Sequence, residues 1–284
     1  MRTLRTIAEL RAALAQPRRE GRRIGLVPTM GALHEGHLSL IRRARGECDE
    51  VVVSLFVNPA QFNRSSDLAS YPRDEARDAA AAAEQRVDYL FAPALDEMYP
   101  TGFATTVSVA GGITDVLEGA HRGRDHFDAV ATVVCKLFSI VAPDVAYFGQ
   151  KDAQQTLVVR RLVRDLNLPV QIEECPTVRA PDGLALSSRN VLLSPAERER
   201  AAALSSALAT TQVLAAAGET DVATLLGAGR SELADPFIKV DYFEIVNPDT
   251  LEALTGLDGP ALALVAAWVG QTRLIDNQLL SVPA

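Results

Sequence analysis

Apolar runs alternate with helix-like stretches over the first 176 residues of the chain. Continuous apolar segments such as VVVSLFV at 51–57 are typical of strands that are buried on both faces of a sheet. Intervening segments such as DAQQTLVVRRLVRDL at 152–166 have apolar positions at helical spacing. Strands that alternate with helices in this way form βαβ units. The pattern therefore predicts an α/β fold with a doubly wound parallel sheet over residues 1–177.

The pattern changes after Pro176. A turn signal at Pro181-Asp182-Gly183 is followed by an alanine-rich helical region from Ser194 to about Ala234. Three strand-like runs then follow one another without helices between them, which favours an antiparallel sheet; they are FIKVDYFEIV, ALALVAAWV and TRLIDNQLL. We therefore expect a smaller α+β domain over residues 178–284.

The N-terminal segment MRTLRTIAELRAALAQPRREGRR has apolar positions at helical spacing, at Leu4, Ile7, Leu10 and Leu14, which predicts a surface helix. It lacks the compact apolar block and the small-residue cleavage site of a secretion signal. The longest apolar runs are also shorter than the roughly 20 residues that a membrane-spanning helix needs. We interpret the chain as a cytoplasmic protein without a membrane partner.

The charge and the rare residue types narrow the function further. The formal net charge of −8 argues against broad binding to nucleic acid, so an anionic ligand must be held locally. Only three of the 28 basic residues are lysines, Lys136, Lys151 and Lys239, so a lysine in a polar motif needs a specific explanation. The three cysteines, Cys48, Cys135 and Cys175, are too widely spaced for a disulfide framework and are interpreted as buried free thiols.

Three polar segments follow predicted strands directly. PTMGALHEGH follows the strand at 23–27, NPAQF follows the strand at 51–57, and GQKDAQQ follows the strand at 145–148. Ligands of doubly wound sheets bind beyond the carboxyl ends of the strands, where strand order reverses. These segments are therefore the candidate functional site.

The first segment contains two of the four histidines, His34 and His37. If a helix begins near Ala32 or Leu33, the two imidazoles share one face, and Gly36 leaves that face open. Backbone N–H groups of the preceding turn would then be available to phosphate oxygens at a helix N-terminus. Zinc binding and a purely structural role are alternatives, but the spacing differs from the metalloprotease pattern and no third ligand stands out.

Two further segments carry groups suited to a nucleotide. Lys151 and Asp152 are predicted to start a helix, where the ammonium could contact phosphate and the carboxylate could help to hold Mg²⁺. Gln154 and Gln155 point in different directions, so at most one of them reaches the site. The hydroxyls and guanidinium of LALSSRN at 184–190 could wrap a polyphosphate. A solvated helix cap and an ordinary polar loop are the respective alternatives.

Together these blocks resemble one protein family over nearly the whole chain. VPTMGALHEGHLSLI, FVNPAQF, YPR, HFDAVATVV, AYFGQKDAQQ and CPTVRAPDGLALSSRN are similar to the HxGH nucleotidyltransferase superfamily and, more closely, to the pantothenate synthetase (pantoate–β-alanine ligase, AMP-forming) family. The resemblance implies a Rossmann-like catalytic domain, a lid-like C-terminal domain, a homodimer, and ATP with Mg²⁺. It also implies the condensation of (R)-pantoate with β-alanine to pantothenate through a pantoyl adenylate, with release of AMP and pyrophosphate.

The resemblance also assigns roles to individual residues. His37, His34 and Lys151 are implied to be catalytic, Gln61 and Gln155 to bind pantoate, with Gln61 also near β-alanine, and Asp152 to hold Mg²⁺. Asp78 resembles an acidic position near the site, with its role left open. The residues implied to bind ATP are Met30, Gly31, Ala32, Leu33, His34, Glu35, Gly36, His37, Gly149, Gln150, Lys151, Asp152, Val178, Leu186, Ser187, Ser188 and Arg189.

The chain departs from the family pattern in three places. Residues 121–127 read HRGRDHF, with one additional residue and no proline, so either Arg122 or Arg124 could take the place of the family's arginine. Gln150 stands where many relatives have glutamate, and so does Ser66, before Asp67. Two other functions share these motifs, namely an adenylyltransferase acting on a phosphorylated acceptor and a non-catalytic nucleotide-binding protein.

Overall fold

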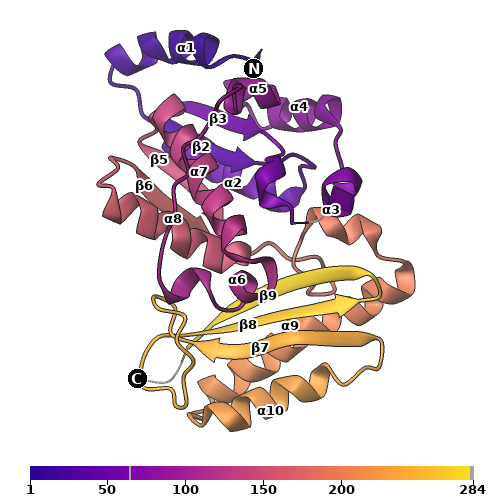
Figure 1. Ribbon diagram of the computed structural model, residues 1–284. Coiled ribbons are helices and arrows are strands. Elements are labelled where there is room, and N and C mark those ends of the chain that lie inside the picture. The colour runs from indigo at the N-terminus through magenta and orange to yellow at the C-terminus, as the bar shows by residue number, and fades with distance from the viewer. Residues whose placement is uncertain (64, 282–284) are drawn as a thin grey trace. The chain divides into compact units, whose positions relative to one another are not determined.

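The computed structural model describes residues 1–63 and 65–281, with only the backbone described for Ser66, Asp67 and Ser70. The chain divides into two compact units (Figure 1). The first comprises Met1–Gly149 and Gln154–Pro176, and the second comprises Gln150–Ala153 and Thr177–Ala284. In the part of the chain that is described, every helix is too short or too polar to cross a lipid bilayer.

The first unit is built on a six-stranded sheet with the order β1-β4-β3-β2-β5-β6, in which each pair of neighbours is parallel. Because β2 lies between β3 and β5, strand order reverses at this point, which is where ligands of doubly wound sheets bind. The strands are β1 (Arg2–Leu4), β2 (Ile24–Thr29), β3 (Glu50–Leu55), β4 (Tyr89–Phe91), β5 (Val145–Gly149) and β6 (Gln171–Cys175).

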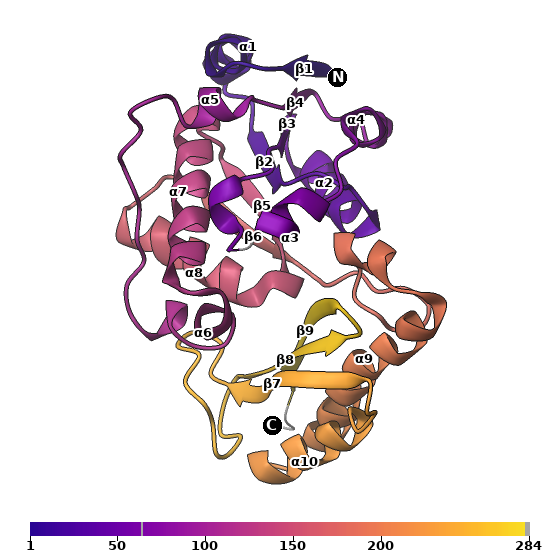
Figure 2. The ribbon, with the colours of Figure 1, turned by 45° about the vertical axis from the view of Figure 1, so that its right-hand side comes forward.

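Helices cover both faces of this sheet (Figure 2), α2 and α4 on one and α1 and α7 on the other. The central strands β2 and β3 are therefore buried almost throughout, as their continuous apolar sequences predict. Helix α2 packs against them through Leu40, Ile41 and Ala44. The longer helices are α1 (Ile7–Arg19), α2 (Glu35–Glu47), α4 (Glu75–Glu84), α7 (Arg124–Val141) and α8 (Ala153–Asp165).

Shorter helical turns connect these elements in the first unit. They are η1 (Pro59–Gln61), α3 (Ser65–Ser70), α5 (Leu95–Met98), η2 (Gly112–Thr114) and α6 (Glu118–Arg122).

The N-terminus differs from the prediction of one continuous helix. Leu4 belongs to β1, which pairs with β4 at the edge of the sheet, and α1 begins only at Ile7. Thr6 starts the helix there, because its side chain accepts a hydrogen bond from the N–H of Glu9 while the Glu9 carboxylate accepts from the N–H of Thr6. Apolar spacing alone could not separate this three-residue strand from the helix.

The second unit contains a three-stranded antiparallel sheet with the order β7-β8-β9. Its strands, β7 (Ile238–Val246), β8 (Ala261–Val269) and β9 (Thr272–Leu280), match the three predicted runs. The predicted alanine-rich helical region is two helices, α9 (Pro195–Ala216) and α10 (Val222–Glu232). Two short turns also belong to this unit, η3 (Gln150–Asp152) and η4 (Ser188–Leu192).

Helices α9 and α10 pack against the antiparallel sheet and form the core of this unit with it. Leu204 and Leu208 of α9 and Leu225 of α10 are buried there with Phe243 and Val265 of the sheet. The parallel sheet flanked by helices in the first unit and the separate antiparallel sheet in the second confirm the predicted fold class.

Candidate active site

The segment after β2 is a tight turn that leads into α2. Gly31 (φ +84°) and Ala32 (φ +52°) adopt left-handed backbone conformations, so the helix does not begin at Ala32 or Leu33 as predicted but at Glu35. Asp78 of α4, only 2% exposed, holds the turn by accepting hydrogen bonds from the N–H groups of Ala32 (2.8 Å) and Leu33 (2.7 Å). Its carboxylate also lies where a side chain at Gly31 would have to fit.

The two histidines form a pair at the start of α2. His34 is the N-cap residue, and its Nδ1 accepts a hydrogen bond from the N–H of Gly36 at 3.1 Å. The Nδ1 of His37 accepts from the N–H of His34 at 3.4 Å, and the ring centroids are 4.1 Å apart. A neutral imidazole whose Nδ1 accepts carries its proton on Nε2. Both rings therefore offer an Nε2–H donor beside a helix N-terminus, a combination suited to phosphate oxygens.

Zinc was the metal alternative for this pair. Within residues 1–63 and 65–281, histidine, cysteine, aspartate and glutamate side chains form no group of three or more that could hold a metal ion. A zinc site needs at least three such ligands.

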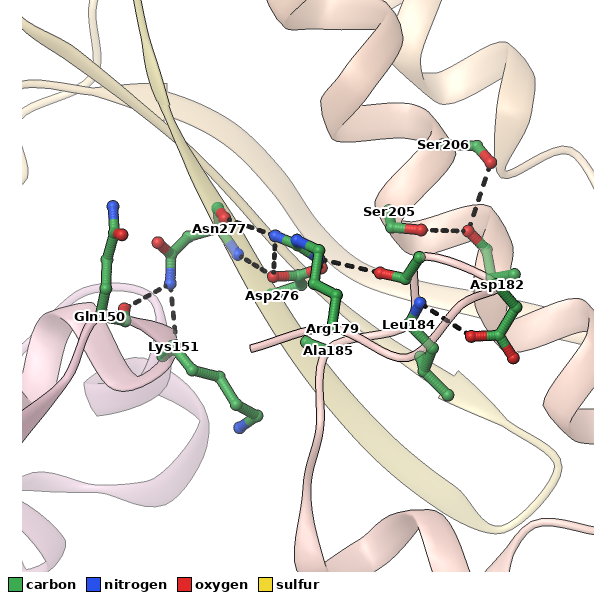
Figure 3. A network of polar contacts seen from close by, with 12 residues as sticks. Gln150, Lys151, Arg179, Asp182, Leu184, Ala185, Ser205, Ser206, Asp276 and Asn277 are labelled. Carbon is green, nitrogen blue, oxygen red and sulfur yellow. Dashed lines mark hydrogen bonds and ion pairs between the residues drawn. The ribbon is translucent and has the colours of Figure 1, made fainter. Parts of the chain in front are cut away.

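Lys151 and Asp152 lie in the 3-10 turn η3 and not in an α-helix. The Lys151 ammonium is 3.5 Å from Oδ1 of Asp152, whose side chain is 48% exposed. Figure 3 shows that the backbone of this turn is held from β9, because the side-chain amide of Asn277 donates to the carbonyl oxygens of Gln150 and Lys151, each at 2.9 Å. The turn thus presents a cation and a carboxylate on a fixed backbone.

Residues 178–186 form a small hairpin that carries two of the predicted nucleotide residues. The N–H of Leu186 donates to the carbonyl oxygen of Val178 at 3.0 Å, and Arg179 pairs with Ala185. The next residue, Ser187, caps η4 by accepting from the N–H of Arg189 at 3.2 Å. Ser187, Ser188 and Arg189 are all half-buried. These groups lie in sequence on a short capped turn.

The two candidate pantoate residues lie in the first unit. Gln61 ends η1 after β3 and is 9% exposed, and its carbonyl oxygen accepts a hydrogen bond from Nδ1 of His126 at 2.8 Å. Gln155 is half-buried on α8. Its neighbour Gln154 is buried, and both ends of its amide are hydrogen-bonded inside the protein, so it is not a candidate for substrate binding.

The amide of Gln154 fixes the segment before α6. Its Nε2 donates to the carbonyl oxygens of Ile113 (2.8 Å) and Val116 (2.9 Å), and its Oε1 accepts from the N–H of Glu118 (3.0 Å). The Glu118 carboxylate then accepts from Nε of Arg122 at 2.8 Å. Arg124, in contrast, lies 3.6 Å from the exposed Asp115. Of the two arginines left open by the sequence, Arg122 is the one tied to a buried acidic group.

Sequence reasoning left the role of Asp78 open and missed Arg179, Asp276 and Asn277 altogether. The signal for Asp78 was a charged residue on the buried side of an alanine-rich helix. Asp276 and Asn277 were polar residues inside a strand-like run, a pattern equally typical of an exposed strand face. Their partners lie 97 to 127 residues away in the chain, so no local pattern could reveal them.

Comparison with known proteins identifies the same family that the sequence motifs resemble. The profile of the pantoate-beta-alanine ligase family matches residues 2–279. The chain is 55% identical to a pantothenate synthetase of Chelativorans sp., over 99% of this chain and 98% of the relative. It is 52% identical to that of Koribacter versatilis, over 99% and 96% of the two chains.

Solved structures agree with the sequence matches. The pantothenate synthetase of Thermus thermophilus is 53% identical, with a TM-score of 0.93 over 98% of this chain and 99% of that one. A pantoate-beta-alanine ligase of Francisella tularensis, complexed with beta-gamma ATP and beta-alanine, is 34% identical, with a TM-score of 0.82 over 98% and 97%. The chain therefore belongs to the pantoate–β-alanine ligase family.

Proposed function

We propose that this protein joins (R)-pantoate to β-alanine at the expense of ATP, forming pantothenate through a pantoyl adenylate and releasing AMP and pyrophosphate. The observation that carries the proposal is the His34–His37 pair, whose Nδ1 atoms are occupied by backbone N–H groups. Both Nε2–H groups are thereby set as donors at the carboxyl end of β2, where strand order reverses. Such donors suit a reaction in which negative charge grows on phosphate.

The first step activates the acid. A carboxylate acylates poorly because its leaving group would be oxide, so the pantoate carboxylate attacks the α-phosphorus of ATP and pyrophosphate leaves. This step needs no general base, since the nucleophile is already ionised. What it needs is stabilisation of charge on the α-phosphate and pyrophosphate by positioned donors. We assign this task to His34, His37 and Lys151.

The remaining nucleotide contacts come from backbone and hydroxyl groups. The N–H groups at the start of α2 are suited to phosphate oxygens. Ser187, Ser188 and Arg189 are assigned to the β- and γ-phosphates, since they offer two hydroxyls and a guanidinium in sequence. The full set assigned to ATP consists of residues 30–37 and 149–152 with Val178 and residues 186–189.

Neutral side chains are assigned to the acid substrate. Gln61 and Gln155 can hydrogen-bond both a hydroxyl and a carboxylate without the charge pairing that would weaken the carboxylate as a nucleophile. In the second step, the free amine of β-alanine attacks the acyl carbon of the adenylate, the amide bond forms and AMP leaves. Gln61 is also assigned a place near this amine.

Mg²⁺ fits the donor set as a phosphate-bound ion. Asp152 supplies one accessible carboxylate, and Mg²⁺ commonly uses one or two carboxylates together with substrate phosphates and waters. Asp152 would hold the ion. When bound, Mg²⁺ neutralises phosphate charge.

The proposal is tested by AMP release with ATP and Mg²⁺, omitting pantoate and β-alanine in turn. Release that requires both acid and amine is the expected result. A stable AMP ester formed without an amine would instead indicate an adenylyltransferase, and ATP binding without pyrophosphate release in the complete mixture would indicate a non-catalytic protein. Either result would overturn the proposed reaction.

The assembly is proposed from the family resemblance, and the compartment from the sequence pattern described above. We propose a homodimer located in the cytoplasm. Sedimentation velocity of the purified protein tests the first, with twice the chain mass of 30.4 kDa as the expected result. Fractionation of cells that express the full chain tests the second.

A further inference from the structure

Two consecutive residues of β9, Asp276 and Asn277, are polar and yet buried, at 4% and 2% exposure. They lie in the middle of the strand, opposite Val265 and Leu264 of β8. Neighbouring residues of a strand point to opposite faces, so a buried polar pair at adjacent positions requires a separate set of partners for each residue. Figure 3 shows that these partners belong to two different segments, residues 150–151 and 179–185.

Asn277 holds the turn that carries Lys151. Its Nδ2 donates to the carbonyl oxygens of both Gln150 and Lys151 at 2.9 Å. Carbonyl oxygens only accept hydrogen bonds, so the atom that faces them must be the amide nitrogen. One NH₂ group thus fixes two successive peptide units of η3.

The other end of the same amide is unsatisfied. Among the residues that the structure describes, Oδ1 of Asn277 is buried and has no hydrogen-bond partner. A buried acceptor without a partner is unfavourable. An apolar residue at position 277 would avoid this penalty. The presence of asparagine is therefore explained by the two hydrogen bonds that its NH₂ group donates, and not by packing.

Asp276 holds the hairpin that carries Val178 and Leu186. Its carboxylate forms a two-pronged ion pair with Arg179, at 2.5 Å and 3.0 Å. Arg179 also donates to the carbonyl oxygens of Gly183 (3.2 Å) and Asn277 (3.3 Å). Paired guanidinium and carboxylate groups fix orientation as well as distance.

We propose that Asp276 and Asn277 are positioning residues that hold the two nucleotide-binding segments of this unit, residues 150–152 and 178–186, on one strand. The inference rests on the proposed function, because it assigns Lys151 to the phosphates. Asn277 acts through the backbone of Lys151, and Asp276 acts through Arg179. A displacement of about 1 Å at a positioned group costs on the order of a hundredfold in rate, so anchoring of the lysine has a direct effect on adenylate formation.

The experiment compares Asn277→Ala, Lys151→Ala and the double variant in full-length protein. Pantoate-dependent pyrophosphate release is measured in a single turnover at saturating ATP, together with the melting temperature. Asn277→Ala is expected to slow release about tenfold or more while the apparent affinity for pantoate is unchanged. Because the amide acts through the lysine, Asn277→Ala should cause no further loss when Lys151 is already alanine.

A matched control and a conservative variant separate positioning from folding. Gln278→Ala alters the next residue of β9, whose exposed amide donates to the carbonyl oxygen of the adjacent Leu279, and should retain the wild-type rate. Asn277→Asp keeps the size of the side chain but replaces both donors by acceptors, and should be at least as slow as Asn277→Ala.

The outcomes distinguish this inference from the function on which it rests. If Lys151→Ala is slow while Asn277→Ala keeps the wild-type rate, the inference alone is wrong. Additive losses in the double variant would also overturn it, since they would show that Asn277 acts independently of the lysine. If the wild-type protein releases no pyrophosphate with pantoate, the proposed function itself fails.

Discussion

The Oδ1 atom of Asp78 lies 2.7 Å from the backbone nitrogen of Leu33, across 45 residues of sequence. Its second oxygen accepts from the adjacent N–H of Ala32. One buried carboxylate therefore fixes two successive peptide units directly before the histidine pair. This contact gives Asp78 a positioning role that the sequence left open.

Replacement of Asp78 by asparagine tests this role. The amide has one oxygen for two N–H donors, and its NH₂ group would face the second donor. We expect the free energy of unfolding to fall by about 1–3 kcal/mol and the KM for ATP to rise, as measured by urea denaturation and pyrophosphate release. Asp74→Asn on the same helix is the control, because asparagine is an equally good N-cap and should leave both quantities near wild type.

Gly31→Ala places a methyl group in a site that has no room for it. The added Cβ would lie 2.9 Å from Oδ2 of Asp78 and 3.1 Å from Cδ1 of Leu55, at a φ of +84° that L-residues rarely adopt. We expect a loss of about 1–3 kcal/mol in unfolding free energy, measured by urea denaturation. The matched control is Gly46→Ala in the exposed part of α2, where no atom lies within 4 Å and stability should rise by about 0.5 kcal/mol. Equal effects at the two glycines would contradict the packing argument.

The tautomer of His37 predicts which substitutions are tolerated. The amide nitrogen of glutamine can approach the position of Nε2, whereas that of asparagine reaches only the position of Nδ1. We expect His37→Asn and His37→Ala to slow pyrophosphate release about a hundredfold or more, the usual cost of losing one charge-stabilising donor. His37→Gln should retain more activity than His37→Asn. The reverse order would show that Nδ1, and not Nε2, faces the phosphates.

Removal of Mg²⁺ is expected to stop the reaction. Chelation with EDTA should abolish AMP release, and added Mg²⁺ should restore it. If Asp152 holds the ion, Asp152→Asn raises the Mg²⁺ concentration needed for half-maximal rate several-fold, whereas Asp165→Asn at the end of α8 leaves it unchanged. An unaltered Mg²⁺ dependence in Asp152→Asn would remove that assignment.

The thiol of Cys175 should resist alkylation in the native state. Burial raises the pKa of this thiol to about 11, and the negative charge of Glu173 contributes in the same direction. The reactive thiolate is therefore scarce at pH 8 and becomes abundant only as the pH rises through 11. Mass spectrometry after brief treatment with iodoacetamide should find Cys175 unmodified in native protein and fully modified in urea. Rapid native labelling at pH 8 would contradict its burial.

The sequence predicted the fold class correctly because apolar runs alternate with helix-like stretches along the chain, and it predicted the family correctly because several distinct motif blocks match it. Continuous apolar runs identify β2 and β3, and the polar segments that follow them mark the carboxyl edge of the sheet. The spacing of His34 and His37 identified the pair without any tertiary information. The structure brings their rings to 4.1 Å, although His34 is the extended N-cap residue and only His37 lies in the helix.

The details that failed depend on contacts between distant residues. The start of α2 was placed too early because the turn at Ala32 is stabilised by Asp78 of another helix. The spacing of Gln154 and Gln155 could not show which of them is available to a substrate. The side chain of Gln154 is hydrogen-bonded to the carbonyl oxygens of Ile113 and Val116, which are distant in the sequence. No pattern in the sequence indicated Asn277, because its side chain hydrogen-bonds to residues more than a hundred positions away.

His34 caps α2, and the proposed function gives the same side chain a second task as a phosphate donor. Serine, aspartate and asparagine are the preferred N-cap residues, so the imidazole is not the choice that helix stability alone would favour. Selection for heat resistance would favour those smaller residues at position 34, and under the proposed function this would remove a phosphate donor. If His34 has the proposed role, position 34 is one where stability and turnover compete.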